Sequence, residues 1–331
     1  MSNNNEALFE AFLNQHDDRA WAGVIRDLLP FIHDVDKNAT EIWFHFYPLA
    51  LSRALEQAED RDELAQKLLL QGNYSLKGQV ADSHRFLYGH RYWAEVKRAV
   101  EERAASDKAP ASLELASQIR EIASAVAALV KADASLLVGI TAVAFLTLQH
   151  VGIDDFKASS AAVRAVKKSP ERILKERARD DGQGLFGFLR GEEKVYTVTF
   201  DETDESAKFK LINSQHLTTA AAADKRDHTR RDARIKSDEG PIPVECRSAS
   251  CGTCWVGVLG GAEKLSEVGA LEGRRIKEFG YIATNEAKPL VRLACQAQAY
   301  GAVSIVIPPW NGVFGKHLSK QKAREQEAVG D

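Results

Sequence analysis

Four cysteines carry the strongest chemical signal in this 331-residue sequence, because all of them fall into one pattern. Cys246, Cys251 and Cys254 follow the spacing C-x4-C-x2-C, and Cys295 stands alone further along the chain. Thiolates are soft ligands that suit iron in a cluster. Three cysteines on one short loop with a distant fourth give the plant-type spacing of a 2Fe-2S cluster. The pattern therefore indicates iron–sulfur chemistry.

The residues around these cysteines agree with such a site. Small side chains between the first three cysteines let the backbone curl closely, so that its N–H groups can point at the sulfur atoms. The segment 255–259 then predicts a strand that ends at two glycines, and the segment 302–307 predicts a last strand that ends at two prolines. The small loop residues are Ser248, Ala249, Ser250, Gly252 and Thr253.

Residues 193 to 312 resemble a 2Fe-2S ferredoxin domain of the β-grasp type. The segment VRLACQAQAYGAVSIVIP is similar to the fourth-ligand segment and closing strand of that family. The resemblance implies that Cys246, Cys251, Cys254 and Cys295 are the iron ligands. The interval between Cys254 and Cys295 is closer to that of the vertebrate and bacterial hydroxylase-type ferredoxins than to the plant proteins. An Arg/Asp-rich insertion, roughly 222–240, precedes the first ligand.

Three other uses of the cysteines are a structural zinc site, a disulfide framework and free buried thiols. Zinc sites usually pair C-x2-C with a second C-x2-C or with two histidines, whereas Cys295 has no such companion. A disulfide framework needs an oxidising compartment, and the amino-terminal segment has no secretory pattern. The iron cluster is the interpretation that the spacing favours over these three.

Length and charge narrow the class of protein. A chain of this length holds two domains, and its net charge of −3 gives no bulk nucleic-acid signature. The most apolar run, 136–148, is too short for a bilayer, which needs about 20 residues, so we expect a buried core helix there. We therefore expect a cytoplasmic protein with no membrane span and no nucleic-acid partner.

The first half shows helical periodicity and no strand alternation, which predicts an all-α domain over 1–168. Residues 38–41 read as a capping box that opens a helix, and Pro48 is expected to kink or split that helix. Further helices are expected over 62–71 and 80–104, and from a cap at Ser112. The run 136–148 is expected to be the central helix, packed on all sides.

Histidines and aromatic residues gather in the segment 83–93, SHRFLYGHRYW. His84 and His90 could belong to a second metal or haem site. Their spacing of six does not place both on one helical face, and no acidic cluster accompanies them. Packing at a helix contact is therefore the favoured interpretation, and a second cofactor stays open.

The rest of the chain completes a multidomain fold, with the all-α domain followed by an α+β, β-grasp ferredoxin-like domain. We expect a charged linker and docking segment over 169–192, the ferredoxin-like domain over 193–315 and a charged tail over 316–331. Strands are expected over 194–200 and 207–211, and a helix over 216–224. The basic stretch 225–236 is either a docking surface or a solvated helix extension.

The expected function is one-electron transfer. The resemblance implies a ferredoxin-like carrier, or the iron–sulfur subunit of an oxidoreductase system, with redox partner proteins and with the helical domain for docking. The chain has no glycine-rich dinucleotide fingerprint, so electrons are expected to come from and pass to other proteins. It is therefore expected to be an electron-transfer protein rather than a stand-alone enzyme. The alternative is a redox-sensing or structural use of the cluster in a helical interaction protein.

Overall fold

The computed structural model describes residues 2–80, 82–106, 114–163, 168–179, 194–279 and 287–315. The chain divides into two compact units. A helical unit comprises Met1–Ala54 and Ser75–Glu171, and a second unit comprises Leu55–Tyr74 and Arg172–Asp331. The predicted helical domain over 1–168 thus differs from the compact unit, because residues 55–74 cluster with the carboxy-terminal half. Two predicted segments lie outside the described residues: the charged tail 316–331, and residues 185–189 of the docking segment predicted over 169–192.

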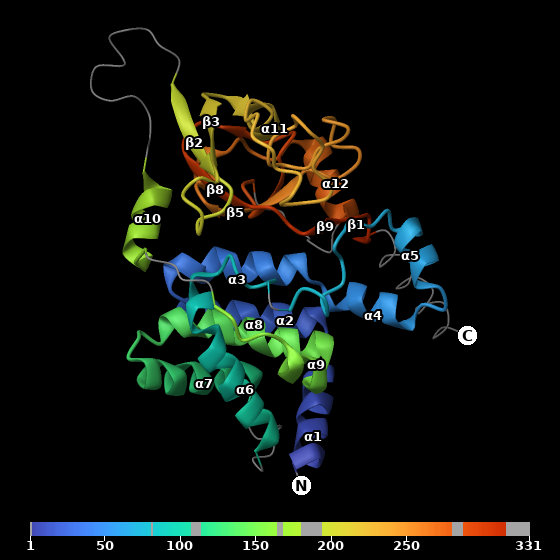
Figure 1. Ribbon diagram of the computed structural model, residues 1–331, viewed down its shortest axis with the longest axis vertical. Helices are drawn as coiled ribbons and strands as arrows, with labels where there is room; N and C mark the ends of the chain where they lie inside the picture. The colour runs from blue at the N-terminus through green and yellow to red at the C-terminus, as the bar shows by residue number, and fades with distance from the viewer. Residues whose placement is uncertain are drawn as a thin grey trace. The chain divides into compact units, whose positions relative to one another are not determined.

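The helical unit is built around α8 (Ser135–Val151), which contacts its helical neighbours on several sides (Figure 1). Every residue from Leu136 to Val151 is buried, which confirms the predicted central helix. Gly152 ends the helix with a left-handed φ of 81°. The other elements described in this unit are α1 (Ser2–Asn14), α2 (Asp18–Leu28), η1 (Leu29–Phe31), α3 (Asp34–Phe46), α4 (Leu49–Gln57), η2 (Tyr88–Tyr92), α6 (Trp93–Ala105), α7 (Leu115–Val130) and α9 (Ile153–Ala158).

Several predicted helix boundaries in this half are wrong. Helix α3 begins at Asp34, where the Nδ1 atom of His33 accepts from the N–H of Val35, so residues 38–41 lie inside the helix. The helix does split before Pro48, as predicted. Residues 82–92 form turns and a short 3₁₀ helix, so the α-helix predicted over 80–104 begins only at Trp93. The predicted cap at Ser112 lies outside the described residues.

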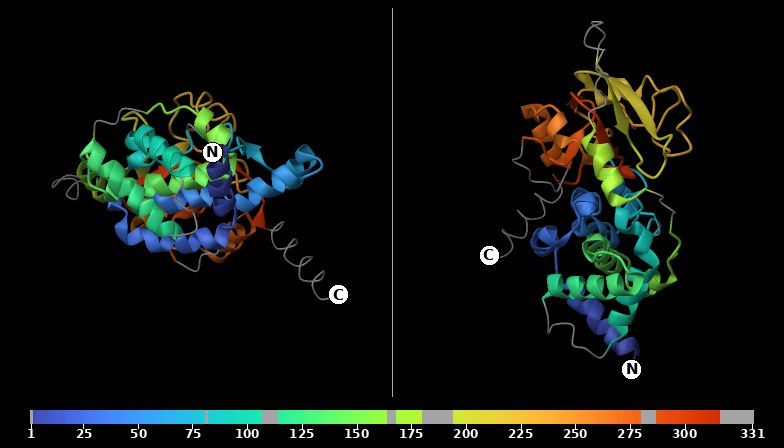
Figure 2. Two further views of the ribbon diagram at one scale, coloured as in Figure 1. Left: turned by 90° about the horizontal axis from the view of Figure 1, so that it is seen from below. Right: turned by 90° about the vertical axis from the view of Figure 1, so that its left-hand side faces the viewer.

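The second unit contains a five-stranded mixed sheet in the order β3-β2-β8-β5-β6. Strand β2 pairs antiparallel with β3 and parallel with β8, while β5 pairs antiparallel with β8 and β6. The yellow β2–β3 hairpin and the orange helix α12 lie at opposite ends of this sheet (Figure 2). The strands are β2 (Val195–Thr199), β3 (Lys208–Ile212), β5 (Trp255–Gly260), β6 (Val291–Leu293) and β8 (Val303–Val306).

Four of these strands, β2, β3, β5 and β8, confirm the four strands expected from the sequence, with ends that differ by at most one residue. Alternate residues of β2 and β3, such as Val198 and Leu211, are buried, and every residue of β5 is buried. The helix expected over 216–224 is shorter, as α11 (Leu217–Ala221). The remaining elements of this unit are α5 (Arg61–Lys67), β1 (Gln71–Gly72), α10 (Pro170–Ala178), β4 (Gln215–His216), η5 (Ala262–Lys264), α12 (Ala270–Phe279), β7 (Gln298–Ala299) and β9 (Trp310–Asn311).

The end of α10, which lies in the charged linker predicted over 169–192, is bound to the sheet of the second unit. The Arg177 guanidinium forms a two-pronged ion pair with Glu202, at 2.7 and 2.9 Å, and both side chains are largely buried. The Ser304 hydroxyl on β8 donates to the same carboxylate, at 2.6 Å. This end of α10 is therefore part of the folded second unit.

The described residues contain no helix that is both long enough and apolar enough to cross a bilayer.

Candidate metal centre

The loop that carries the first three cysteines runs from the buried segment 242–244 to the start of β5. Three of its residues have left-handed backbone angles: Arg247 at φ 52°, Ala249 at φ 59° and Gly252 at φ 75°. Such angles turn successive peptide N–H groups toward one side of the backbone, which suits the binding of a negatively charged group. The loop therefore has the close curl that its small residues predicted.

The thiol of Cys246 lies at the focus of this curl. Its Sγ atom accepts from three backbone N–H groups: Ser248 at 3.5 Å, Ser250 at 3.3 Å and Cys251 at 3.3 Å. Hydrogen bonds to sulfur stabilise the thiolate form and tune the potential of an iron–sulfur cluster. The backbone of the loop is thus arranged to stabilise a thiolate at Cys246.

Cys254 and Cys295 are brought together by the pairing of β5 with β6. Trp255 is the register partner of Leu293, and the Ala294 N–H donates to the Cys254 carbonyl oxygen at 2.9 Å. Both cysteines are buried, with exposed fractions of 2% and 5%. The turn after β6 thus delivers the fourth cysteine to the loop that holds the other three.

The four thiols also act on one another electrostatically. Burial works to raise the pKa of the Cys246 thiol, but hydrogen bonds from Ser250, Ser248 and Cys251 outweigh it and lower the pKa to about 6. A hydrogen bond with Cys254 is the main cause that lowers the pKa of Cys295 to about 6. The same contact, together with burial, raises the pKa of Cys254. Negative charge on Cys246 acts to raise the pKa of Cys295, and negative charge on Cys251 acts to raise that of Cys254.

The arrangement of the four cysteines suits a two-iron cluster better than a single metal ion. Within the described ranges, no three histidine, cysteine, aspartate or glutamate side chains surround one point closely enough for a single ion. A 2Fe-2S cluster has four cysteine ligands on two irons, so two close pairs are needed rather than one tetrahedron. The thiols of Cys246 and Cys251 form one hydrogen-bonded pair, and those of Cys254 and Cys295 form the other. The residues present therefore fit a two-iron cluster.

Trp255 and Trp310 pack against each other next to this site. Both are buried, their ring centroids are 5.5 Å apart, and the planes meet at 74°. The Trp255 indole N–H donates to the Trp310 carbonyl oxygen at 3.0 Å. The residue that follows the third ligand is thereby fixed to the last strand.

A fully buried ion pair near the fourth ligand escaped the sequence analysis. The Arg292 guanidinium on β6 meets the Glu272 carboxylate on α12, and the two side chains are 0% and 1% exposed. Arg292 also donates to the Ser266 carbonyl oxygen at 2.7 Å. Charged residues of both signs alternate through 263–292, so the sequence offered no signal that singled out this pair.

His84 and His90 lie together in the helical unit, contrary to the argument from helical spacing. Their Nδ1 atoms are 2.8 Å apart, and the His84 ring stacks on Trp93 at a centroid distance of 3.6 Å. The spacing argument was wrong because this segment is not an α-helix. Burial lowers the pKa of His84 well below its usual value, which keeps this ring neutral. Within the described residues, no third histidine and no cysteine, aspartate or glutamate joins the two histidines to form a metal site.

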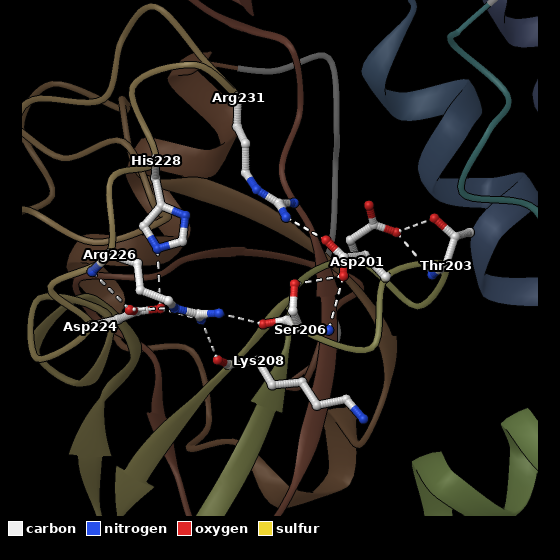
Figure 3. A network of polar contacts seen from close by, with 9 residues as sticks. Asp201, Thr203, Ser206, Lys208, Asp224, Arg226, His228 and Arg231 are labelled. Carbon is white, nitrogen blue, oxygen red and sulfur yellow. Dashed lines mark hydrogen bonds and ion pairs between the residues drawn. The ribbon is translucent and has the colours of Figure 1, made fainter.

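The Arg/Asp-rich insertion is a cross-braced loop, not a helix extension (Figure 3). Arg226 donates to the backbone oxygens of Ser206 and Lys208, at 2.6 and 2.7 Å, and pairs with Asp224. Arg231 pairs with Asp204 in the β2–β3 turn. These arginines hold the loop to the hairpin, so the predicted helix is wrong and much of the positive charge is matched internally.

Comparison with known proteins identifies the class of this half of the chain. Residues 215–300 match the family model described as the 2Fe-2S iron-sulfur cluster binding domain. All four cysteines lie inside the matched range, and the cofactor of this domain is a 2Fe-2S cluster. No solved structure matches the chain.

Proposed function

We propose that this protein transfers single electrons through a 2Fe-2S cluster ligated by Cys246, Cys251, Cys254 and Cys295. The observation that carries the proposal is the convergence of three backbone N–H groups on the Cys246 sulfur, inside a range that matches a cluster-binding family. We assign Cys246 and Cys251 to one iron and Cys254 and Cys295 to the other, because the thiols of each pair are in hydrogen-bond contact.

We also propose that the second unit is a β-grasp domain. Its support is a mixed sheet in which the first and last long strands, β2 and β8, run parallel side by side at the centre. The β2–β3 hairpin flanks this pair on one side, and β5 with β6 flanks it on the other. This arrangement places the ends of β5 and β6 together, where the Cys254 and Cys295 segments meet.

When bound, the cluster accepts and returns one electron at a time. The chain's own residues set how readily that happens. The N–H groups of Ser248, Ser250 and Cys251 stabilise negative charge on sulfur, and the amide of Gln296 donates to the Cys295 Sγ atom at 3.5 Å. Cys246 and Cys251 are only partly buried, so the loop side of the site is the side nearer to solvent.

We propose that electrons pass to and from separate redox proteins, with the helical unit as a docking element in an oxidoreductase system. Four ligands that must stay reduced suit a reducing compartment, so we propose the cytoplasm as the location. We further propose residues 169–192 as the linker between the two predicted domains.

The test is anaerobic purification, followed by iron and acid-labile sulfide analysis, visible circular dichroism and electron exchange with a ferredoxin reductase. We expect two irons and two sulfides per chain, and reversible reduction. Each Cys→Ser variant at the four positions should lose or alter the spectrum, whereas the control Thr253→Ser should retain it. An unchanged spectrum in Cys295→Ser would refute the ligand assignment, and redox-dependent partner binding without electron exchange would point to sensing.

A further inference from the structure

Three segments of the second unit that are far apart in the sequence are joined by hydrogen bonds close to Cys254. Strand β1 pairs antiparallel with β9, with Gln71 opposite Asn311 and Gly72 opposite Trp310 (Figure 1). Two more backbone hydrogen bonds extend this pairing, from Asn73 to Pro309 at 2.8 Å and from Val313 to Leu68 at 2.7 Å. We call residues 68–73, residues 308–313 and Arg234 the clasp. Most of the clasp lies outside the range that matches the cluster-binding family.

Arg234 links the clasp to the loop that precedes the ligands. Its side chain is 5% exposed and pairs with Asp232, and its guanidinium donates to the Asn311 side chain at 3.1 Å and to the Pro308 carbonyl oxygen. A guanidinium presents several donors in a rigid fork, so one side chain serves the Asn311 side chain on β9, the Pro308 carbonyl oxygen before β9 and the Asp232 carboxylate. Arg234 is thus the polar centre of the clasp.

Gly72 allows β1 to approach both Pro309 and Arg234 closely. Its φ is +75°, and a Cβ atom there would lie 2.4 Å from the Pro309 oxygen and 3.0 Å from the Arg234 Nε atom. A larger residue at this position would therefore separate β1 from both β9 and Arg234. The clasp depends on this one glycine as well as on the guanidinium.

The clasp reaches the metal centre through the two tryptophans. Trp310 belongs to β9, and its carbonyl oxygen accepts from the Trp255 indole, so the position of β9 fixes the first residue of β5. Trp255 directly follows Cys254, whose carbonyl oxygen is bound by the residue that precedes Cys295. A shift of β9 would therefore be passed to the Cys254–Cys295 pair.

We propose that Arg234 is a positioning residue that, through the clasp, holds Cys254 and Cys295 in the geometry needed for the cluster. The inference rests on the ligation proposed above. It assigns a role in the metal centre to residues 68–73, which belong to the amino-terminal half of the sequence.

The test compares Arg234→Gln with the matched control Arg226→Gln in the full-length protein loaded with its cluster. Arg226 lies in the same loop and also pairs with an aspartate and backbone oxygens, but it binds the β3 side rather than β9. We measure the rate of cluster loss to an iron chelator, the visible circular dichroism and the thermal midpoint. Arg234→Gln should lose the cluster about tenfold faster, the effect of removing one hydrogen bond to a charged group, and should change the dichroism.

Arg226→Gln should lower the thermal midpoint but change the rate of cluster loss by less than about twofold, as for a pair on the surface. Arg234→Lys should lie between Arg234→Gln and the parent, because it keeps the charge without the fork. Equal rates in the two glutamine variants, or a parent-like rate in Arg234→Gln, would overturn the inference while leaving the ligands in place. A parent protein without iron and sulfide would instead refute the proposed function, and the inference with it.

A second pair of variants tests the glycine. Gly72→Val should speed cluster loss as Arg234→Gln does, and the double variant should show less than the sum of the two effects, because both open the same contact. Gly269→Val is the control, since a Cβ atom at Gly269 meets nothing within 4 Å. Additive effects of Gly72→Val and Arg234→Gln would show that the two residues act separately and would contradict the clasp.

Discussion

Arg292 and Glu272 form a buried ion pair in which the Nε atom lies 2.9 Å from Oε1 and an Nη atom lies 3.0 Å from Oε2. The Glu272 carboxylate also accepts from the Leu293 N–H at 2.9 Å. The pair therefore fastens α12 to β6 only two residues before Cys295. Helix α12 lies between Cys254 and Cys295 in the sequence, so this contact fixes the path of the segment that joins them.

Glu272→Gln should destabilise the second unit strongly, because it leaves the Arg292 charge buried without its partner. The expected loss is about 3–5 kcal/mol in the free energy of unfolding. The control is Glu278→Gln on the same helix, whose partner Arg275 is partly exposed and whose pair is worth about 0–1 kcal/mol. Denaturant unfolding followed by visible absorption measures both. Similar losses in the two variants would contradict the role given to the buried pair.

The left-handed angle at Arg247 leads to a test of the cluster loop. Arg247→Gly and Arg247→Val both remove the charge, but only glycine adopts a φ of 52° without strain. The valine variant should therefore be less stable than the glycine variant by about 1–2 kcal/mol, with a lower yield of assembled cluster. Iron content and the thermal midpoint are the measurements. Equal behaviour of the two variants would mean that the loop does not need this backbone angle.

The helical unit has a comparable pair of glycines. A Cβ atom at Gly139 in α8 would lie 2.5 Å from the Thr40 hydroxyl oxygen, whereas one at Gly23 in α2 meets nothing within 4 Å. Gly139→Ala should therefore cost about 1–3 kcal/mol through overpacking. Gly23→Ala should add about 0.5–1 kcal/mol through helix propensity. Far-ultraviolet circular dichroism during unfolding measures both, and the cluster spectrum of the folded variants should stay unchanged. A stabilising Gly139→Ala would show that α3 does not approach α8 so closely.

Stability should fall in mild acid because of His150. Burial lowers its pKa to about 3, while the unfolded chain binds a proton near the usual value of 6.5. Between these values the unfolded state holds more protons, so each unit of falling pH removes about 1.4 kcal/mol of stability through this group. Above pH 6.5 the group contributes no pH dependence.

The comparison variant for this pH effect is His150→Gln, which cannot take up a proton. Its unfolding free energy should change less between pH 6.5 and 4.5 than that of the parent, as measured by urea unfolding at each pH. Parallel pH profiles of parent and variant would exclude His150 as the source of the acid dependence.

The second unit should lose stability only in stronger acid. The hydrogen bond from Arg226 is the main cause that lowers the pKa of Asp224 to about 2, so the loss of stability that protonation of Asp224 causes begins only below pH 3.8.

The sequence predicted the class of cofactor because the cysteine spacing is a local pattern. The cysteine spacing and the small loop residues bring Cys246 and Cys251 together within one turn, and strand alternation predicts the pairing that delivers Cys295. The packing of α8 followed in the same way from an uninterrupted apolar run. Each of these features is encoded within a short stretch of chain.

The features that sequence reasoning missed all depend on contacts between distant residues. His84 and His90 meet because residues 82–92 fold as turns, which no helical periodicity describes. The arginines of the insertion looked like a free basic surface, although Arg226 and Arg231 find acceptors in the β2–β3 hairpin. Strand β1 is only two residues long, and its partner β9 lies far from it in the sequence. No local sequence pattern therefore predicts the pairing.

The pairing of β1 with β9 also constrains the order of events during synthesis. The ribosome completes β1 long before it makes residues 310–311, so β1 has no partner strand until then. A contact this far apart in sequence closes late and slowly. All four cysteines are therefore synthesised before β1 can pair, and the contact that holds Trp310 beside Trp255 closes after them.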